Sequence, residues 1–265
     1  MPNKYVEVEG YAVNYFHTGP TTLPPVVPDV NKGKLLLYLH GAGSNGHFAH
    51  KLLDILSAKH SPLSFDYPGH GRSSGTESLK SVTAYSDFAY AFWKKLGIRP
   101  AVLIGHSMGG AIAMDLALRH PDMVDSLVLT CTAPKFNIPD DRLAIWEQVM
   151  KGRAGQPFTK DSCSPATPMN IVQEGWGEQI KTDPRVRYFD LVACREVDLT
   201  AKLGDIRKPT LVLAGQDDTA TPVAQSEQLR DGIPGAKLTV IPQAGHWLPL
   251  EKPQEACEAI TSFLA

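Results

Sequence analysis

The sequence predicts an α/β protein with a mostly parallel, twisted sheet that is covered by helices. Two patterns lead to this prediction. Short, fully apolar runs recur along the chain, and such runs are typical of strands that are buried on both faces. Segments of helical period separate the runs, and this alternation implies parallel strands joined by crossover helices. A length of 265 residues fits one large domain, since α/β domains commonly reach about 250 residues.

The individual elements follow from local patterns in chain order. Residues 6–8 and 12–16 alternate in polarity around Glu9-Gly10, which predicts an opening hairpin. Residues 20–34 carry four prolines and predict a surface loop. Buried strands are expected at 35–39, 101–104, 126–129, 210–214 and 238–241. Helices are expected at about 47–58, 82–96, 109–119, 223–230 and 254–264.

The alternation of strands and helices stops between residues 134 and 205, where no comparable apolar run occurs. We therefore expect a mainly helical lid inserted after the sixth strand. The chain then divides into a core, residues 1–133 and 206–265, and a lid, residues 134–205.

Charge and composition narrow the classes of partner. Lys and Arg number 26 and Asp and Glu 28, for a net charge of −2 with no run of one sign, so neither a nucleic acid nor a membrane partner is expected. Apolar runs such as Leu35 to Leu39 are far shorter than the roughly 20 residues of a membrane helix. Glu7 interrupts any signal-peptide core, which predicts a cytoplasmic protein. Cys131, Cys163, Cys194 and Cys257 have no paired spacing, so reduced thiols are expected. The sequence does not predict an oligomeric state.

The most informative motif is Gly105-His106-Ser107-Met108-Gly109, which stands between a buried strand and an alanine-rich helix start. In that context the two glycines allow a sharp strand-to-helix turn, which holds the serine strained and exposed at the helix N-terminus. A serine hydroxyl is a weak nucleophile until a base takes its proton and an acid orients that base. Ser107 is therefore the predicted nucleophile.

Residues suited to be the base and the acid follow later strands. His246 comes after the strand at 238–241, and Asp218 comes after the strand at 210–214. Both thus lie at the carboxyl ends of strands, in the chain order serine, acid, histidine. Asp217 adjoins Asp218 and is the alternative acid.

With these features the chain resembles an α/β-hydrolase of the lidded, esterase-like kind. Three further stretches agree: His40-Gly41-Ala42-Gly43-Ser44 resembles the oxyanion loop, residues 65–73 the turn after the next strand, and Gly215-x-x-Asp218 the acid loop. The resemblance selects Asp218 over Asp217. It implies an oxyanion hole formed by the backbone N–H groups of Ala42 and Met108. A helix N-terminus such as that of Met108 also favours developing negative charge.

Other polar residues near these motifs are expected to be structural. This group comprises Asp66, His40 and His106. The histidines at 17, 47, 50, 60, 70 and 120 are expected to be surface or packing residues. Some lidded relatives carry the acid after the strand that follows the nucleophile, but Thr130-Cys131-Thr132-Ala133 offers no carboxylate. No metal or nucleotide motif is present, so neither a metal nor another cofactor is expected.

A serine at the elbow favours acyl transfer over the chemistry of relatives with an aspartate there. Aromatic residues of the lid, with Trp146 and Trp176 among them, predict an apolar substrate pocket, to which Trp247 also contributes. The predicted function is a serine hydrolase that cleaves carboxylic esters of small to medium apolar substrates. The other aromatic and methionine candidates for this pocket are Phe136, Phe158, Tyr188, Phe189, Met150 and Met169.

Two alternatives remain open. The first is a hydrolase that cleaves carbon–carbon bonds in ring-fission products, because related enzymes often carry Trp directly after the histidine. Its substrate carboxylate needs an arginine, for which Arg185, Arg187 and Arg195 are candidates. The second is a ligand receptor or signalling protein with an intact triad, which would turn over p-nitrophenyl esters once at most.

Overall fold

The computed structural model describes residues 1–23 and 26–265. Pro24 and Pro25 of the expected surface loop lie outside the described residues. The described remainder of residues 20–34 forms neither helix nor strand, as expected.

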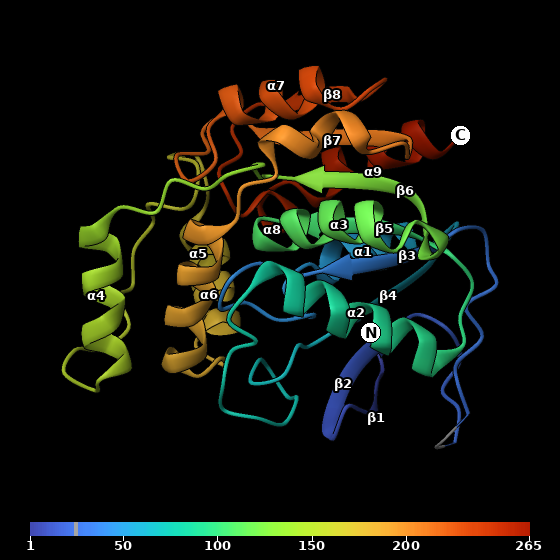
Figure 1. Cartoon of the computed structure of the whole chain (residues 1–265), viewed down its shortest axis with the longest axis horizontal. Coiled ribbons are helices and arrows are strands. Elements are labelled where there is room, and N and C mark those ends of the chain that lie inside the picture. The colour runs from blue at the N-terminus through green and yellow to red at the C-terminus, as the bar shows by residue number, and fades with distance from the viewer. Residues whose placement is uncertain (24–25) are drawn as a thin grey trace.

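In the described part of the chain, eight strands form one sheet in the order β1-β2-β4-β3-β5-β6-β7-β8 (Figure 1). The first two strands form the expected antiparallel hairpin, and β2 also runs antiparallel to β4. All other neighbours are parallel, so the predicted mostly parallel sheet is confirmed. The strands are β1 Asn3–Val8, β2 Tyr11–His17, β3 Leu35–Leu39, β4 Ser61–Phe65, β5 Ala101–His106, β6 Val124–Thr130, β7 Thr210–Gly215 and β8 Lys237–Ile241.

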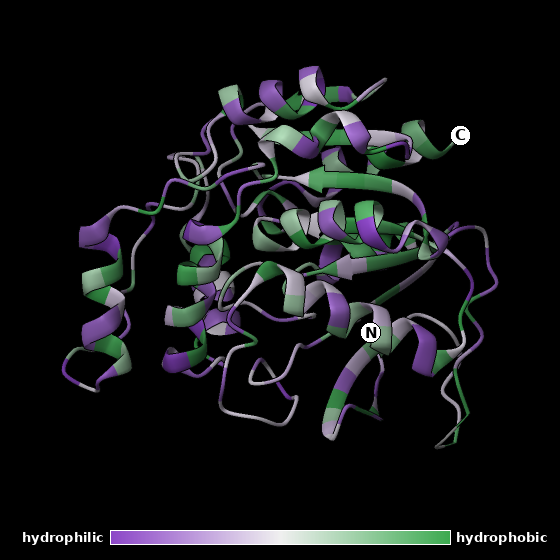
Figure 2. Cartoon of the chain, viewed as in Figure 1, coloured by the Kyte–Doolittle hydropathy of each residue, from purple (hydrophilic) through white to green (hydrophobic). Residues whose placement is uncertain are grey.

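Helices cover both faces of the sheet. One face carries α2 Val82–Leu96, α3 Met108–Arg119 and α7 Val223–Gly232, and the other carries α1 His50–Leu56, α8 Leu248–Glu251 and α9 Pro253–Leu264. Successive side chains of β3 enter the two cores in turn, because side chains alternate along a strand. The central strands are accordingly apolar along most of their length (Figure 2). A short 3₁₀ helix, Pro121–Met123, leads into β6.

Two elements differ from the sequence patterns. Strand β4 is absent from the predicted apolar runs because serines and a proline interrupt it, yet Ser64 is fully buried and its hydroxyl donates to Gly46 O at 2.8 Å. Helix α1 begins at His50 rather than at residue 47. The preceding residues form tight turns instead, with the N–H of Phe48 bonded to Asn45 O at 3.2 Å.

Residues 134–205 connect β6 to β7 and contain α4 Asp140–Met150, α5 Met169–Gln179, α6 Pro184–Glu196 and a 3₁₀ helix, Thr200–Asp205. Figure 1 places these α-helices beyond the carboxyl ends of the parallel strands. Helices α4 and α6 pack together through Leu143 and Leu191, and α5 packs on Trp247. The inserted segment thus lies over the carboxyl ends of the parallel strands, where the predicted site residues are. None of the helices within the described residues is long and apolar enough to cross a membrane.

Candidate functional site

Ser107 occupies a sharp turn between β5 and α3. Its φ of 55° lies in the left-handed region, which costs energy for a residue with a side chain. Its backbone is fixed on both sides: the N–H donates to Thr130 O at 3.1 Å, and Thr132 Oγ1 donates to Ser107 O at 2.7 Å. A Cβ on Gly105 would collide with the carbonyl of Gly109. A Cβ on Gly109 would likewise collide with Leu39 O, so the turn needs glycine before the serine and after it.

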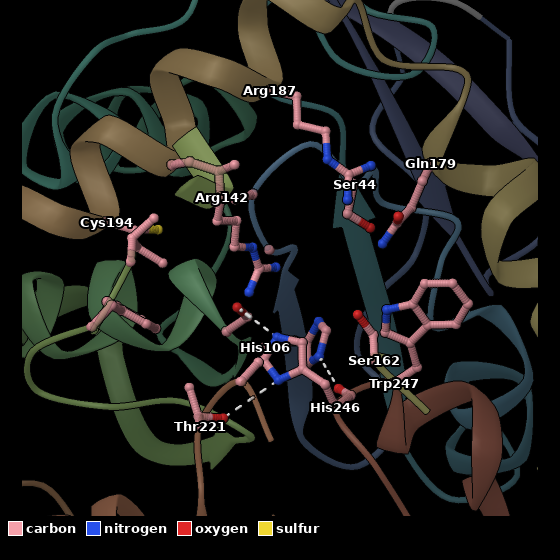
Figure 3. Close-up of a pocket in the computed structure, with 17 residues that line it drawn as sticks. Ser44, His106, Arg142, Ser162, Gln179, Arg187, Cys194, Thr221, His246 and Trp247 are labelled. Atoms are coloured by element: carbon pink, nitrogen blue, oxygen red, sulfur yellow. Dashed lines mark hydrogen bonds between the residues drawn. The ribbon is translucent and has the colours of Figure 1, made fainter. Parts of the chain in front are cut away.

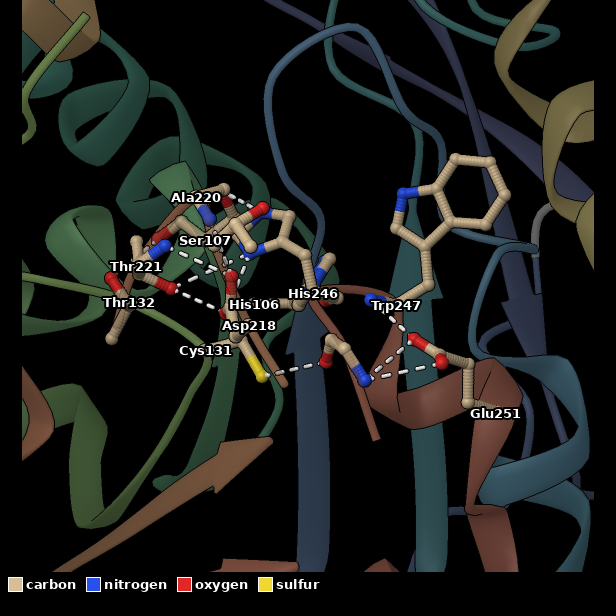
Figure 4. Close-up of polar contacts among 12 residues, drawn as sticks. His106, Ser107, Cys131, Thr132, Asp218, Ala220, Thr221, His246, Trp247 and Glu251 are labelled. Carbon is tan, nitrogen blue, oxygen red and sulfur yellow. Dashed lines mark hydrogen bonds and ion pairs between the residues drawn. The ribbon is translucent and has the colours of Figure 1, made fainter. Parts of the chain in front are cut away.

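Ser107, His246 and Asp218 form one hydrogen-bonded chain (Figure 4). His246 Nε2 lies 3.0 Å from Ser107 Oγ, and His246 Nδ1 lies 2.9 Å from Asp218 Oδ2. A carboxylate can only accept, so Nδ1 carries the proton and Nε2 is free to accept from the serine hydroxyl. The structure thus brings these three predicted residues together in an order that can move a proton off the serine.

The Asp218 carboxyl is kept ionised by its surroundings. Burial, with only 5% of the residue exposed, disfavours the charge. The charge of His246 and hydrogen bonds from His246 and Thr221 outweigh burial and lower the pKa of Asp218 to about 2. Thr221 donates to Oδ2 through its hydroxyl at 2.7 Å and to Oδ1 through its N–H at 2.9 Å. The sequence patterns did not single out Thr221.

Asp217, the alternative acid, points elsewhere. Its carboxylate accepts from Ser164 Oγ at 2.5 Å, and its N–H bonds Ala244 O at 2.8 Å. Of the two neighbouring carboxylates, Asp218 is the one that contacts His246. Asp217 instead links the acid loop to the segment at 134–205.

Glu251, another residue missed by the sequence patterns, holds the loop around His246. Its Oε1 accepts from the N–H of Trp247 at 3.0 Å and from that of Gly245 at 3.2 Å, so it fixes the backbone on both sides of the histidine. Its Oε2 accepts from Ser164 N at 2.9 Å. The one feature of the sequence that could have indicated this role is that Glu251 is a carboxylate only five residues after His246.

The predicted oxyanion donors, Ala42 and Met108, flank Ser107. Met108 is the first residue of α3, where backbone N–H groups have no intrahelical acceptor. Ala42 lines the same pocket as Ser107. The preceding residue, Gly41, lies so close that a Cβ on it would be 3.0 Å from Ser107 Cβ. Both N–H groups thus belong to backbone that borders the serine.

A buried polar cluster fixes the loop that carries Ala42. Asp190 of α6 accepts from Gly43 N at 2.8 Å and pairs with His70 Nε2 at 2.8 Å, and both side chains are fully buried. Tyr85 and Ser78 donate to its other oxygen at 2.5 and 3.0 Å. His70 was expected to be a surface or packing residue. It is fully buried, as a packing residue is, but its ion pair with Asp190 was not predicted, because that partner comes from a helix far along the chain.

Burial opposes both charges of the Asp190–His70 pair, but their attraction and hydrogen bonds outweigh it. The pKa of Asp190 is therefore lowered and that of His70 raised. Asp190 stabilises the fold fully above its ordinary pKa of 3.8, and this contribution is lost as the pH falls through its folded pKa. His70 contributes fully below its ordinary pKa of 6.5, and this contribution is lost as the pH rises through its folded pKa.

We therefore expect the pair to contribute most to stability between about pH 4 and 6.5. Asp190→Asn should lower the free energy of unfolding in that window by about 3–5 kcal/mol, since it leaves a buried charge unpaired. It should also lower kcat by loosening Gly43. Urea unfolding across a pH series measures this. Asp198→Asn, at an exposed ion pair with Lys135, is the control and should change little. Equal effects of the two substitutions would contradict the assignment.

The residues expected to be structural are buried and hold backbone groups near the site. His40 and His106 are buried, and desolvation lowers the pKa of each to about 3, so both are neutral. His106 Nε2 donates to the backbone oxygen of His246 at 2.7 Å. Asp66 accepts from the N–H groups of Gly46 and Arg72 at 2.7 and 2.9 Å. Among the other histidines, His17 is fully buried, whereas His47 and His50 contact Glu178 and Glu174.

Two hollows that share several lining residues, among them Trp247, lie at and beside Ser107. The inner one, about 50 Å³, is lined by Ser107, His246 and Trp247, and the outer one, about 350 Å³, by Trp146, Trp176 and Trp247. Of the other aromatic candidates, Phe136 lines the inner hollow, whereas Phe158 is half exposed.

Within the described residues, no group of three or more His, Cys, Asp or Glu side chains could hold a metal ion. The four cysteines are free and buried.

The expectation of an apolar lining is only partly correct. Arg142 of α4 and Arg187 of α6 border both hollows, and Figure 3 shows both side chains pointing into the inner one. Arg185 and Arg195, the other arginine candidates, instead pair at the surface with Asp183 and Asp140. The difference arises because which face of an inserted helix points inward depends on its tertiary packing.

A mostly parallel sheet combined with a serine at a sharp strand-to-helix turn, hydrogen-bonded through a histidine to an aspartate, is typical of one class of α/β enzymes. The chain belongs to the alpha/beta hydrolase family, whose model matches residues 36–260. It is 28% identical to the sn-1-specific diacylglycerol lipase ABHD11 of Mus musculus, over 93% of this chain and 83% of that protein. It is 26% identical to the 2-hydroxy-6-oxononadienedioate/2-hydroxy-6-oxononatrienedioate hydrolase of a Pseudomonas species, over 89% of each. A solved thermophilic esterase superposes with a TM-score of 0.78 at 28% identity, over 99% of this chain and 97% of that one.

Proposed function

We propose that the protein is a serine hydrolase that cleaves carboxylic esters of small to medium substrates through an acyl-enzyme on Ser107. The observation that carries this proposal is the continuous hydrogen-bonded chain from Ser107 through His246 to Asp218. The similarity to an esterase and to a lipase supports it.

In the proposed mechanism, Ser107 Oγ attacks the ester carbonyl while His246 Nε2 takes its proton. The carboxylate of Asp218 stabilises the resulting imidazolium. The N–H groups of Ala42 and Met108 stabilise the oxyanion, and losing one such donor typically costs about 100 to 1,000-fold in kcat. His246 then protonates the leaving alkoxide. In the second half, His246 takes a proton from the water that attacks the acyl-enzyme. It then returns this proton to Ser107 Oγ, which leaves as the tetrahedral intermediate collapses and the acid is released.

We further propose that residues 134–205 form a lid over a core made of residues 1–133 and 206–265. The inner cavity of about 50 Å³ favours a short group beside Ser107. The larger outer hollow, bordered by Trp146, Trp176 and Trp247, suits the other part of the substrate. The cytoplasmic location, the absence of nucleic acid and membrane partners and the absence of a cofactor stay predictions.

Hydrolysis of p-nitrophenyl acetate, butyrate and octanoate tests the proposed function, with a ring-fission dienoate assayed alongside. Repeated ester turnover, together with organophosphate labelling of Ser107 seen by mass spectrometry, would support it. Cleavage of the dienoate without ester turnover would instead assign the protein to the carbon–carbon bond hydrolases. A single slow turnover would indicate a ligand receptor.

Substrate preference is expected to depend on the lid. Trp176 borders the outer hollow and contacts Phe158 edge-on at 5.5 Å between ring centroids. Trp176→Ala should change the ratio of kcat/KM between esters that differ by one methylene by about 10 to 200-fold. It should not inactivate the protein. Values of kcat/KM across the ester series measure this. Trp93→Ala on α2 is the matched control, and an equal shift in that variant would contradict a role for Trp176.

A further inference from the structure

The inner pocket holds two cationic side chains and no carboxylate. Arg142 reaches it from α4 and Arg187 from α6 (Figure 3). No Asp or Glu occurs among the described residues that line it. The outer hollow includes Asp161, an exposed residue that forms no ion pair with either arginine in the described chain. The two positive charges therefore face the pocket without a neutralising partner.

Several buried donors in this pocket lack an acceptor. The Nε and Nη1 atoms of Arg187 and the hydroxyl of Ser44 are buried and have no hydrogen-bond partner within the described residues. Leaving such groups unpaired is energetically costly, and more so for charged groups. Arg185 and Arg195, on the same helix, both have carboxylate partners. Of the arginines on α6, the one that lines the pocket is therefore the one without a carboxylate partner within the described residues.

Asp190 is a carboxylate whose charge acts on Arg187, but its oxygens are already used. One accepts from Gly43 and pairs with His70, and the other accepts from Tyr85 and Ser78. No ion pair joins it to Arg187 in the described structure. The acceptor that Arg187 lacks must therefore come from outside this part of the chain.

The guanidinium of Arg187 is held in place before any ligand arrives. Its Cζ lies 4.1 Å from the centroid of the Trp146 ring, a cation–π arrangement. Its stem crosses Gly43 so closely that a Cβ there would lie 2.6 Å from Arg187 Cδ. Burial and the charge of Arg142 lower the pKa of Arg187 to about 9, so it stays charged at neutral pH. A rigid, planar donor pair of this kind matches the oxygens of a carboxylate or phosphate.

We infer that Arg187 and Arg142 form a subsite for an anionic group of the substrate, a carboxylate or a phosphate. This inference rests on the proposed function: the substrate is an ester with a negative charge a few bonds from the carbonyl that Ser107 attacks. The short distance follows because both arginines line the same small cavity as Ser107. An anionic substrate replaces the apolar one that the lid aromatics predicted.

The test compares three esters of nearly equal acyl length: p-nitrophenyl butyrate, mono-p-nitrophenyl succinate and p-nitrophenyl 3-phosphonopropionate. The measured quantity is the ratio of kcat/KM for each anionic ester to that for butyrate. We expect a ratio of about 10 or more for the wild-type protein, and Arg187→Met and Arg142→Met should each lower it by about 10 to 100-fold. Arg185→Met, on α6 but outside the pocket, should leave it unchanged. Preference for the succinate would indicate a carboxylate, and preference for the phosphonate a phosphate.

Wild-type ratios near one that both variants leave unchanged would overturn the inference while the proposed function stands. If the wild-type protein hydrolyses none of the esters, the proposed function fails, and calorimetric titration with succinate and inorganic phosphate decides the subsite. Binding that is lost in Arg187→Met but kept in Arg185→Met supports it, and no binding of either anion overturns it. If Arg187→Met does not fold, the variant Arg142→Met, at a half-buried arginine, provides the same readouts.

Discussion

Replacing Ser107 by alanine is expected to lower kcat for short p-nitrophenyl esters by about 10⁴ to 10⁶-fold. In the proposed mechanism the hydroxyl oxygen forms the covalent bond to the acyl group, and no neighbouring group can substitute for it. The fold should be unaffected, because the turn is held by backbone bonds to Thr130 and by the hydroxyl of Thr132 rather than by the serine side chain.

The measurement combines kcat with the midpoint of thermal unfolding. The Ser107→Ala variant should keep the wild-type midpoint and lose the mass increase produced by an organophosphate. Ser57→Ala, at the end of α1 and remote from the pocket, is the matched control. Turnover near the wild-type rate in Ser107→Ala would exclude the proposed acyl-enzyme on this serine.

Features that depend on local pattern could be predicted from the sequence. Short apolar runs predict the buried strands around Leu37 and Leu103. The spacing of two glycines predicts the sharp turn at Ser107. Strand β4 could not be predicted from its hydropathy pattern, because Ser61, Pro62 and Ser64 interrupt its apolar residues. Buried serines can occupy a strand when nearby carbonyls accept their hydroxyls, and sequence patterns do not reveal those acceptors.

Features that depend on distant contacts could not be predicted. The bond from Gly43 to Asp190 joins residues 147 positions apart, and the His70–Asp190 pair joins residues 120 positions apart. The charge of the pocket depends on the same docking of the inserted helices, because rotation of α6 decides which of its three arginines points inward. Composition of the insertion therefore predicted aromatic residues at the pocket but missed Arg142 and the role of Arg187 there.

The acid of the proposed triad gives the second large effect. Asp218→Asn should lower kcat by about 10⁴-fold, because an amide at this position can donate to Nδ1 and so favours the tautomer that protonates Nε2. In that tautomer His246 cannot accept the proton of Ser107. Asp217→Asn should have only a small effect, because its contact is with Ser164 and its amide oxygen can still accept that hydroxyl.

The pH dependence of stability separates the catalytic effect of Asp218 from its structural effect. Since the pKa of Asp218 is lowered to about 2, its ionised form stabilises the fold fully above its ordinary pKa of 3.8, and that contribution is lost as the pH falls toward 2. Asp218→Asn should remove this acid-side dependence from urea unfolding while kcat at neutral pH, measured on the folded variant, remains low. Asp217→Asn should retain the dependence. A larger loss of kcat in Asp217→Asn than in Asp218→Asn would move the acid by one residue, and equal small losses would mean that His246 acts without a carboxylate partner.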